Sequence, residues 1–320
     1  MRLVRQNDKR AVKGTVGRRV RHGRARAGLA VLAACAVASG CTVAGGAASG
    51  GADAVKPAPG PQPLHAPPAR ALDSYAGNLR ATQAARVAMA KKWRLAEPPL
   101  LAPPAPARKP VIRARKGFEV QGQEGLPPVF TTVPTTDKVV FLTIDDGSEK
   151  DPAFLEMMSD LKIPYTAFLS DYLVNDDYGY FRDMQSRGVT LNNHTLTHPY
   201  LPGLSYEEQQ REICGMQRTM QEQYGEQPVA FRPPYGNYNR DTLRAARSCG
   251  IKYAPIWNEE VFVDHFEWRE EDKDLRPGDI ILSHFRGPDE WKGTMPDMVR
   301  RLLKYVTDKG YAVARLEDYL

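Results

Sequence analysis

The stretch Val139-Val140-Phe141-Leu142-Thr143-Ile144-Asp145-Asp146-Gly147 decides the fold. Six mostly apolar residues that favour strands run directly into two carboxylates and a glycine. An apolar run of this length is typical of a strand buried on both faces. Gly147 permits a sharp turn, so the two carboxylates need not point to opposite faces as they would within a regular strand. On its own, the pattern also fits a strand that ends in an ordinary polar turn.

From about Lys138 onwards, predicted strands alternate with predicted helices. We expect strands at 139–144, 165–169, 189–192, 229–231, 252–256, 280–283 and 311–316, and helices at 152–161, 178–185, 205–224, 241–249 and 295–309. Strands that alternate with helices favour parallel pairing through helical crossovers. About seven such units indicate an α/β fold, closed or nearly closed into a barrel, with an open sheet as the alternative.

The N-terminal region explains the positive net charge of the chain. Residues 1–27 hold ten Lys/Arg and one acid, whereas residues 138–320 carry 22 basic and 31 acidic residues. The acidic charge balance of this C-terminal domain argues against a positively charged surface for binding nucleic acid. The Arg-rich start is followed by an apolar stretch at 27–37, which together predict an export signal over residues 1–41.

Small residues directly before Cys41 resemble a bacterial lipobox, in which the cysteine is lipidated and becomes the new N-terminus. Ala38 stands where Leu or Val is usual, and ordinary signal-peptidase cleavage near the same place is the alternative. We expect a protein outside the cell membrane, held on its outer face by a lipid or otherwise secreted. No other membrane contact is expected.

Residues 42–136 are rich in Pro and Ala and predict a tether. Fourteen of the 26 prolines lie between residues 42 and 130. One amphipathic helix is expected near 71–97, as a stalk or brace. The globular domain is then residues 137–320, which we expect to be monomeric. Cys214 and Cys249 could form one disulfide in an oxidising compartment, or remain two buried thiols.

Chemically reactive side chains cluster at the C-terminal ends of the predicted strands. They are Asp145, Asp146, His194, His198, Arg232, Tyr235, Trp257 and His284. In α/β barrels the active site forms at this edge, because the loops that follow the strands converge there. His194 and His198 have metal-ligand spacing, since histidines four apart on a helical turn face the same way. With a carboxylate, they would leave coordination positions open, as catalytic metal sites do.

The motifs Thr143-Ile144-Asp145-Asp146-Gly147, His194-Thr195-x-x-His198, Arg232-Pro233-Pro234-Tyr235 and Leu282-Ser283-His284 occur in this order. Together they resemble the NodB-type polysaccharide deacetylases, carbohydrate esterase family 4. The resemblance covers residues 137–320. It implies a distorted (β/α)7-type barrel and metal-dependent removal of acetyl groups from glycans.

The resemblance also implies a role for each matching residue. Asp146, His194 and His198 would hold a divalent metal, zinc first, with cobalt or other divalent ions possible. Asp145 would be the general base and His284 the general acid that protonates the leaving amine. Arg232 would orient Asp145, Tyr235 would donate its backbone N–H to the oxyanion, and Trp257 would form a wall of the substrate groove.

One family motif is not clearly matched. It places an Asp near a Trp to support the arginine, whereas this chain has Trp257-Asn258-Glu259-Glu260 followed by Asp264. Asp264 or Glu259 is a candidate for that support. The expected partner is an acetylated, extracellular or cell-wall polysaccharide such as peptidoglycan or a chitin-like polymer. A catalytically silent glycan-binding module and a hydrolase of small amides are the alternatives.

Overall fold

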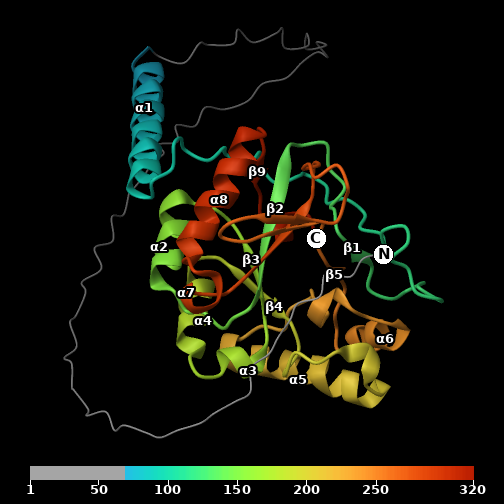
Figure 1. The fold of residues 1–320 in the computed structure, drawn as a ribbon. Coiled ribbons are helices and arrows are strands. Elements are labelled where there is room, and N and C mark those ends of the chain that lie inside the picture. The colour runs from blue at the N-terminus through green and yellow to red at the C-terminus, as the bar shows by residue number, and fades with distance from the viewer. Residues whose placement is uncertain (1–68) are drawn as a thin grey trace, which may run out of the picture. The chain divides into compact units, whose positions relative to one another are not determined.

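The computed structural model describes residues 69–320, so the predicted export signal and Cys41 lie outside the described residues. Its main sheet has seven strands in the order β4-β3-β2-β8-β6-β7, with β9 also paired to β2. These strands are β2 (Val139–Asp146), β3 (Thr166–Leu169), β4 (Thr190–Asn193), β6 (Glu259–Val261), β7 (Phe266–Trp268), β8 (Ile280–His284) and β9 (Ala312–Val313). All their pairings are parallel except that of β6 with β7. The fold is therefore of the mixed α/β class (Figure 1).

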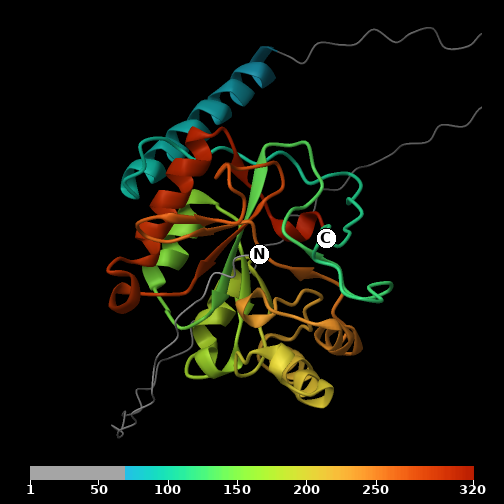
Figure 2. The same cartoon turned by 45° about the vertical axis from the view of Figure 1, so that its right-hand side comes forward.

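Strand β2 is the centre of the sheet, and all eight of its residues are buried. Val140, Leu142 and Ile144 pack into the largest of the four hydrophobic clusters of the described residues. Val139 and Phe141, which point the other way, pack into a second core. The prediction of a strand buried on both faces is confirmed. Figure 2 shows β2, β3 and β4 running side by side.

A second, two-stranded parallel sheet pairs β1 (Val129–Phe130) with β5 (Ala254–Pro255). Isolated bridges connect it to the main sheet through Asn193 with Phe231, Ala230 with Tyr253, and Thr132 with Asp279. The strand expected at 229–231 is confirmed only in part, because the segment makes one parallel bridge on each side, from Phe231 to Asn193 and from Ala230 to Tyr253. The following Pro233 and Pro234 lack the N–H groups that would extend its pairing.

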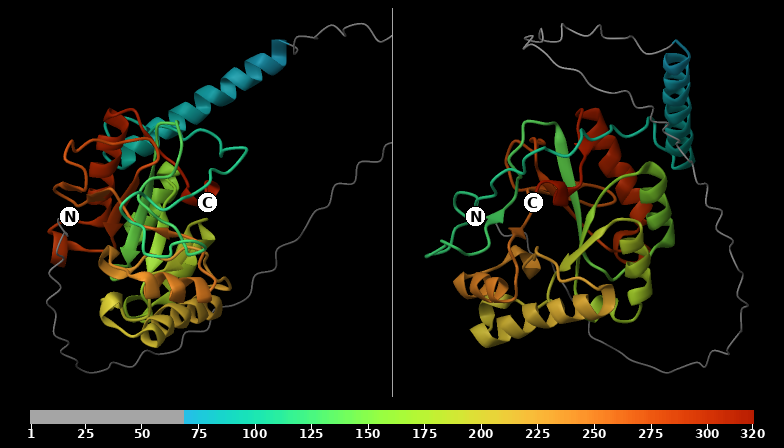
Figure 3. Two further views of the ribbon diagram at one scale, coloured as in Figure 1. Left: turned by 90° about the vertical axis from the view of Figure 1, so that its right-hand side faces the viewer. Right: turned by 180° about the vertical axis from the view of Figure 1, so that it is seen from behind.

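The helices are α1 (Ala69–Lys92), α2 (Pro152–Leu161), α3 (Asp171–Val174), α4 (Tyr178–Ser186), α5 (Tyr206–Tyr224), α6 (Arg240–Ser248), α7 (Pro288–Trp291) and α8 (Met295–Asp308). α2, α4 and α8 lie on one side of β2 (Figure 1), and their buried side chains belong to the largest hydrophobic cluster. α5 and α6 lie side by side, as the views in Figure 3 show. Within the described residues, no helix is long and apolar enough to cross a membrane.

Local signals set the ends of several helices. Asp151 accepts a hydrogen bond from the N–H of Ala153 and precedes Pro152 at the start of α2. Ser205 and Glu208 form the expected capping box at the start of α5, and Gly225 ends that helix in a left-handed conformation. These side chains satisfy backbone groups that the helix itself leaves unpaired.

The folded unit extends further towards the N-terminus than composition indicates. Val129, Phe130 and Val133 are fully or almost fully buried, although they precede Lys138. α1 ends at Lys92, before Arg94 adopts a positive φ of 58°. Beyond it, Trp93 donates a hydrogen bond of 2.8 Å from Nε1 to Asp160 of α2. The region expected to be a tether therefore contributes to the packed domain.

Candidate active site

The turn at the end of β2 brings two carboxylates into one site. Asp146 has a φ of 81° and Gly147 a φ of 104°, so the chain leaves the regular strand conformation between the two acids. A Cβ added at Gly147 would lie 2.4 Å from Cγ1 of Val174, so the turn has no room for a side chain. Position 147 thus requires glycine for two reasons, its positive φ and the close contact with the side chain of Val174.

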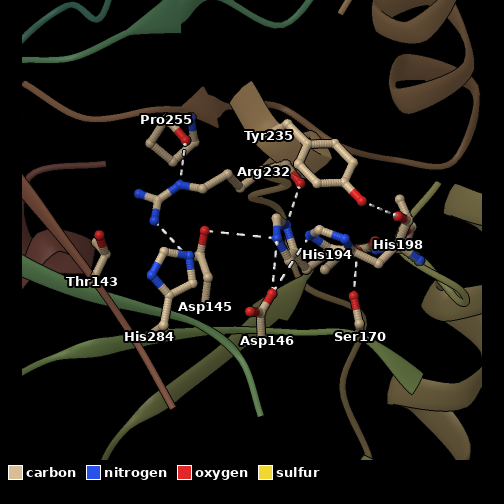
Figure 4. Close-up of polar contacts among 12 residues, drawn as sticks. Thr143, Asp145, Asp146, Ser170, His194, His198, Arg232, Tyr235, Pro255 and His284 are labelled. Atoms are coloured by element: carbon tan, nitrogen blue, oxygen red, sulfur yellow. Dashed lines mark hydrogen bonds and ion pairs between the residues drawn. The ribbon is translucent and has the colours of Figure 1, made fainter. Parts of the chain in front are cut away.

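Asp146, His194 and His198 form the one group of possible metal ligands that we find in the described part of the chain (Figure 4). Oδ1 of Asp146 lies 3.6 Å from Nε2 of His194 and 3.5 Å from Nε2 of His198. All three side chains are buried. Nδ1 of His194 lies 2.7 Å from the carbonyl oxygen of Arg232. Because a carbonyl oxygen can only accept a hydrogen bond, Nδ1 carries the proton, and Nε2 of the neutral imidazole keeps a lone pair for a metal.

The segment from His194 to His198 is not a helical turn, and that part of the sequence argument is wrong. Thr195 and His198 have positive φ values of 75° and 56°. Asn193 Oδ1 accepts from the N–H of Thr195, and Thr195 Oγ1 accepts from the N–H of His198. A turn held by side chains, rather than helical periodicity, brings the two imidazoles together.

The chemistry of these three residues fits a divalent metal ion. Oδ1 of Asp146 is buried and accepts no hydrogen bond from the described residues. Burial and the neighbouring His198 hold the pKa of His194 well below its ordinary value, so the imidazole is neutral. Burial opposes ionisation of Asp146, but the nearby His284, His198 and His194 lower its pKa to about 2. Two imidazole nitrogens and one carboxylate are a typical ligand set of a catalytic metal site.

Asp145 is paired with a fully buried arginine. Nη1 of Arg232 donates a hydrogen bond of 2.7 Å to Oδ1 of Asp145, and its Nε donates to the carbonyl oxygen of Pro255. The guanidinium also lies 4.3 Å from the ring centre of Phe168. Burial raises the pKa of Asp145 to about 7, although Arg232 opposes the rise. Oδ2 of Asp145 lies 3.7 Å from Nε2 of His194, beside the metal-ligand group.

His284 ends β8 directly beside Asp145, its partner in the strand register. Its Nδ1 lies 3.0 Å from Oε1 of Glu260, and both side chains are buried. Burial disfavours the charged imidazolium, but the Glu260 and Asp146 carboxylates outweigh this and raise the pKa of His284 above 6.5. Sequence reasoning missed Glu260. The only signal was a pair of adjacent acids, Glu259-Glu260, in a segment that otherwise reads as a buried strand.

Neither residue proposed as a support for Arg232 has that role. Asp264 is exposed and bonds to His265. Glu259 is buried beside Asp279, which helps to raise its pKa. The segment that departs from the family motif instead provides a partner for His284. β6 pairs with β8 in a register that places Glu260 next to Leu282 and near His284.

Tyr235 and Trp257 lie at the edge of the same site. Tyr235 has a φ of 60°, and its ring centre lies 4.6 Å from that of His198. Its hydroxyl donates to the carbonyl oxygen of His198 at 3.4 Å. Trp257 packs over Gly236, where an added Cβ would lie 3.1 Å from the indole ring. Cys214 and Cys249 form a disulfide that joins α5 to the residue after α6, and none of the site residues belongs to either helix.

Comparison with known proteins identifies the family. A polysaccharide deacetylase profile matches residues 132–254. An uncharacterized Streptomyces coelicolor protein, SCO4760, is 36% identical over 217 residues, covering 68% of this chain and 86% of that protein. A Bacillus cereus peptidoglycan-N-acetylglucosamine deacetylase is 24% identical over 202 residues, covering 59% of this chain and 91% of its own.

Among solved structures, a carbohydrate esterase family 4 pseudoenzyme from Bacillus anthracis superposes with a TM-score of 0.52. It is 19% identical, and the match covers 60% of this chain and 69% of that one. At this identity the likeness concerns the fold alone. Together with the profile match and the Streptomyces relative, the four motifs and their arrangement place this chain in the NodB-type polysaccharide deacetylases, carbohydrate esterase family 4, a family of hydrolases.

Proposed function

We propose that this protein is a metal-dependent hydrolase that removes acetyl groups, most directly N-acetyl groups, from an extracellular or cell-wall glycan. One observation carries the proposal. A base paired with an arginine and an acid paired with a carboxylate flank a group of three metal-ligating side chains. A structural metal site would not need the two flanking pairs.

Asp146, His194 and His198 would hold the divalent ion, zinc first and cobalt as a substitute. When bound there, the ion would polarise the acetyl carbonyl and make a water molecule more acidic. Asp146 is suited to this because its carboxylate stays ionised. His194 is suited because its imidazole stays neutral.

Asp145 would accept the proton of the attacking water. Its pKa of about 7 makes it a general base matched to neutral pH. The hydrogen bond from Arg232 to Oδ1 fixes the carboxylate and leaves Oδ2 facing His194. Arg232 therefore acts as a positioning residue for the base.

His284 would donate a proton to the leaving amine nitrogen. An amine leaves poorly unless it is protonated, so amide hydrolysis needs a separate acid. Glu260 favours the imidazolium by its charge and contacts Nδ1. Tyr235 would contribute its backbone N–H to stabilise the oxyanion, and Trp257 would form a wall of the groove.

The organisation of the whole chain is part of the proposal. The export signal within residues 1–41 would be cleaved before Cys41, which would carry lipid as the new N-terminus, and residues 42–136 would include the tether. The bridges between the two sheets support the interpretation of the catalytic domain as one distorted barrel. Such a protein would act outside the membrane, where peptidoglycan or a chitin-like polymer is the candidate substrate.

Acetate release tests the proposal. The purified protein is stripped with a chelator, given zinc or cobalt, and offered peptidoglycan fragments and chitooligosaccharides, with Asp145→Asn and His194→Ala variants beside it. We expect metal-dependent release from at least one polymer and a loss of at least 100-fold in both variants. Tight metal and glycan binding without any release would instead support a silent glycan-binding module.

A further inference from the structure

The two oxygens of the Asp146 carboxylate have different surroundings. Oδ1 faces the nitrogens of His194 and His198. Oδ2 lies 3.3 Å from Nη2 of Arg286. A carboxylate can bind a metal through one oxygen or through both. The neighbours of Asp146 therefore separate one oxygen for the metal from one that is held by the protein.

Arg286 is itself held by a second carboxylate. It follows His284 by two residues, and its Nη1 pairs with Oε2 of Glu290 in α7. About a fifth of its side chain is exposed. The planar fork of a guanidinium can hydrogen-bond two carboxylates at once, which a single ammonium does less well. Glu290, Arg286 and Asp146 thus form a continuous chain of charge pairs that ends at the metal-ligand group.

The backbone fixes the loop that carries Arg286 against the turn that carries Asp146. The N–H of Phe285 donates to the carbonyl oxygen of Asp145, and the N–H of Glu149 donates to the carbonyl oxygen of Phe285. The hydroxyl of Ser148 donates to the same carbonyl. These bonds bracket Asp146 on both sides in sequence, so Arg286 and Asp146 are set in register before any ligand binds.

We infer that Arg286 is a positioning residue that holds Asp146 as a one-oxygen metal ligand and thereby strengthens metal binding. The inference rests on the proposed function, in which this group binds the ion. The positive charge of Arg286 by itself would repel a cation, but Glu290 offsets that charge. What Arg286 adds is orientation of the ligand. Partners that orient a ligand in this way typically contribute 10- to 100-fold to metal affinity.

The test measures zinc and cobalt dissociation constants by competition with a chromophoric chelator. The variant Arg286→Ala/Glu290→Gln removes the charge chain without changing the net charge. We expect about 10- to 100-fold weaker binding of both ions, with the visible spectrum of bound cobalt altered. Arg286→Lys keeps the positive charge but not the planar fork, so it should also bind the metal ions more weakly. This variant replaces the double variant in the test if the double variant does not fold.

A matched control is Lys304→Ala/Asp308→Asn, which removes an exposed ion pair at the same four-residue spacing on α8. It should bind both ions as the wild type does. Wild-type metal affinity in the Arg286→Ala/Glu290→Gln variant would overturn the inference. If the KM of that variant rose while its metal affinity stayed unchanged, Arg286 would contact the substrate rather than position Asp146. Wild-type protein that binds neither ion would overturn the proposed function itself, so the two failures are distinguishable.

Discussion

At the residue scale, two buried ion pairs favour opposite charge states in the two proton-transfer groups. Arg232 favours the carboxylate form of Asp145 against the effect of burial. Glu260 favours the imidazolium form of His284, also against burial. Burial still raises the pKa of Asp145 to about 7, so near neutral pH part of the population holds an ionised Asp145, while Glu260 favours a protonated His284. A base without its proton beside an acid with its proton is the state that acid–base catalysis requires.

Replacing Glu260 tests this arrangement. In Glu260→Gln the imidazolium of His284 loses its nearest anion, so the pKa of His284 falls. The acid must be protonated to act, so the alkaline limb of the kcat/KM profile should move to lower pH, by roughly one to two units. The matched control is Glu267→Gln on β7. Glu267 is the register partner of Glu260, but its carboxylate pairs with His265. An unchanged alkaline limb in Glu260→Gln would contradict the role of Glu260.

The sequence locates the charged residues at strand ends better than it locates their partners. Asp145 and Asp146 were identifiable because a buried strand ran into them, and His284 because it ended another. Glu260 was not, because choosing between it and Glu259 requires the register of a three-residue strand against β8. Arg286 lies in a loop, where no periodicity indicates the direction of a side chain.

At the element scale, the disulfide is the one covalent link between helices that the described chain shows. It joins Cys214 in α5 to Cys249 after α6, residues that are 35 apart in sequence. Closing a loop of this length restricts the unfolded chain and typically stabilises a fold by about 2–4 kcal/mol. Because the link lies outside the metal-ligand group, its loss should affect stability and leave the site intact.

The prediction is made for Cys214→Ser/Cys249→Ser. The free energy of urea unfolding should fall by about 2–4 kcal/mol, while the zinc affinity of the folded protein stays within twofold of wild type. Wild-type protein treated with a reductant should match the variant. Equal stability of the oxidised and variant proteins would show that the bridge does not contribute.

Elements with local signals were predictable, and those without were not. The capping residues of α2 and α5 sit in the sequence beside the helices that they begin, and those starts were correct. β1 and β6 have two and three residues, too few to show a strand period. The antiparallel β6–β7 hairpin was missed for the same reason, since strand–helix alternation predicts parallel pairs only.

At the scale of the whole molecule, a buried acid makes stability depend on pH. Glu259 is almost fully buried beside Asp279. Burial, with the Asp279 carboxyl group, raises the pKa of Glu259 to about 10. The folded protein therefore keeps this proton, whereas the unfolded chain releases it above an ordinary pKa near 4.5. Stability from this group is complete below pH 4.5 and is lost as pH rises towards 10.

Glu259→Gln removes the proton release on unfolding. Each pH unit in this window costs the wild type about 1.4 kcal/mol through Glu259, so the stability lost between pH 6 and 8 should shrink by roughly 2–3 kcal/mol in the variant. Urea unfolding at the two pH values measures it, with the exposed Glu226→Gln as control. Parallel pH dependences for Glu259→Gln and the wild type would mean that Glu259 is ionised in the fold.

The most direct test of the central claim is the dependence of acetate release on added metal. Metal-free protein at a known concentration is titrated with zinc, and the initial rate of acetate release is measured at each addition. We predict that the rate rises linearly and saturates at one zinc ion per chain, and that His194→Ala shows no saturable rise. Release that is complete without metal, or that persists unchanged in His194→Ala, would contradict the account.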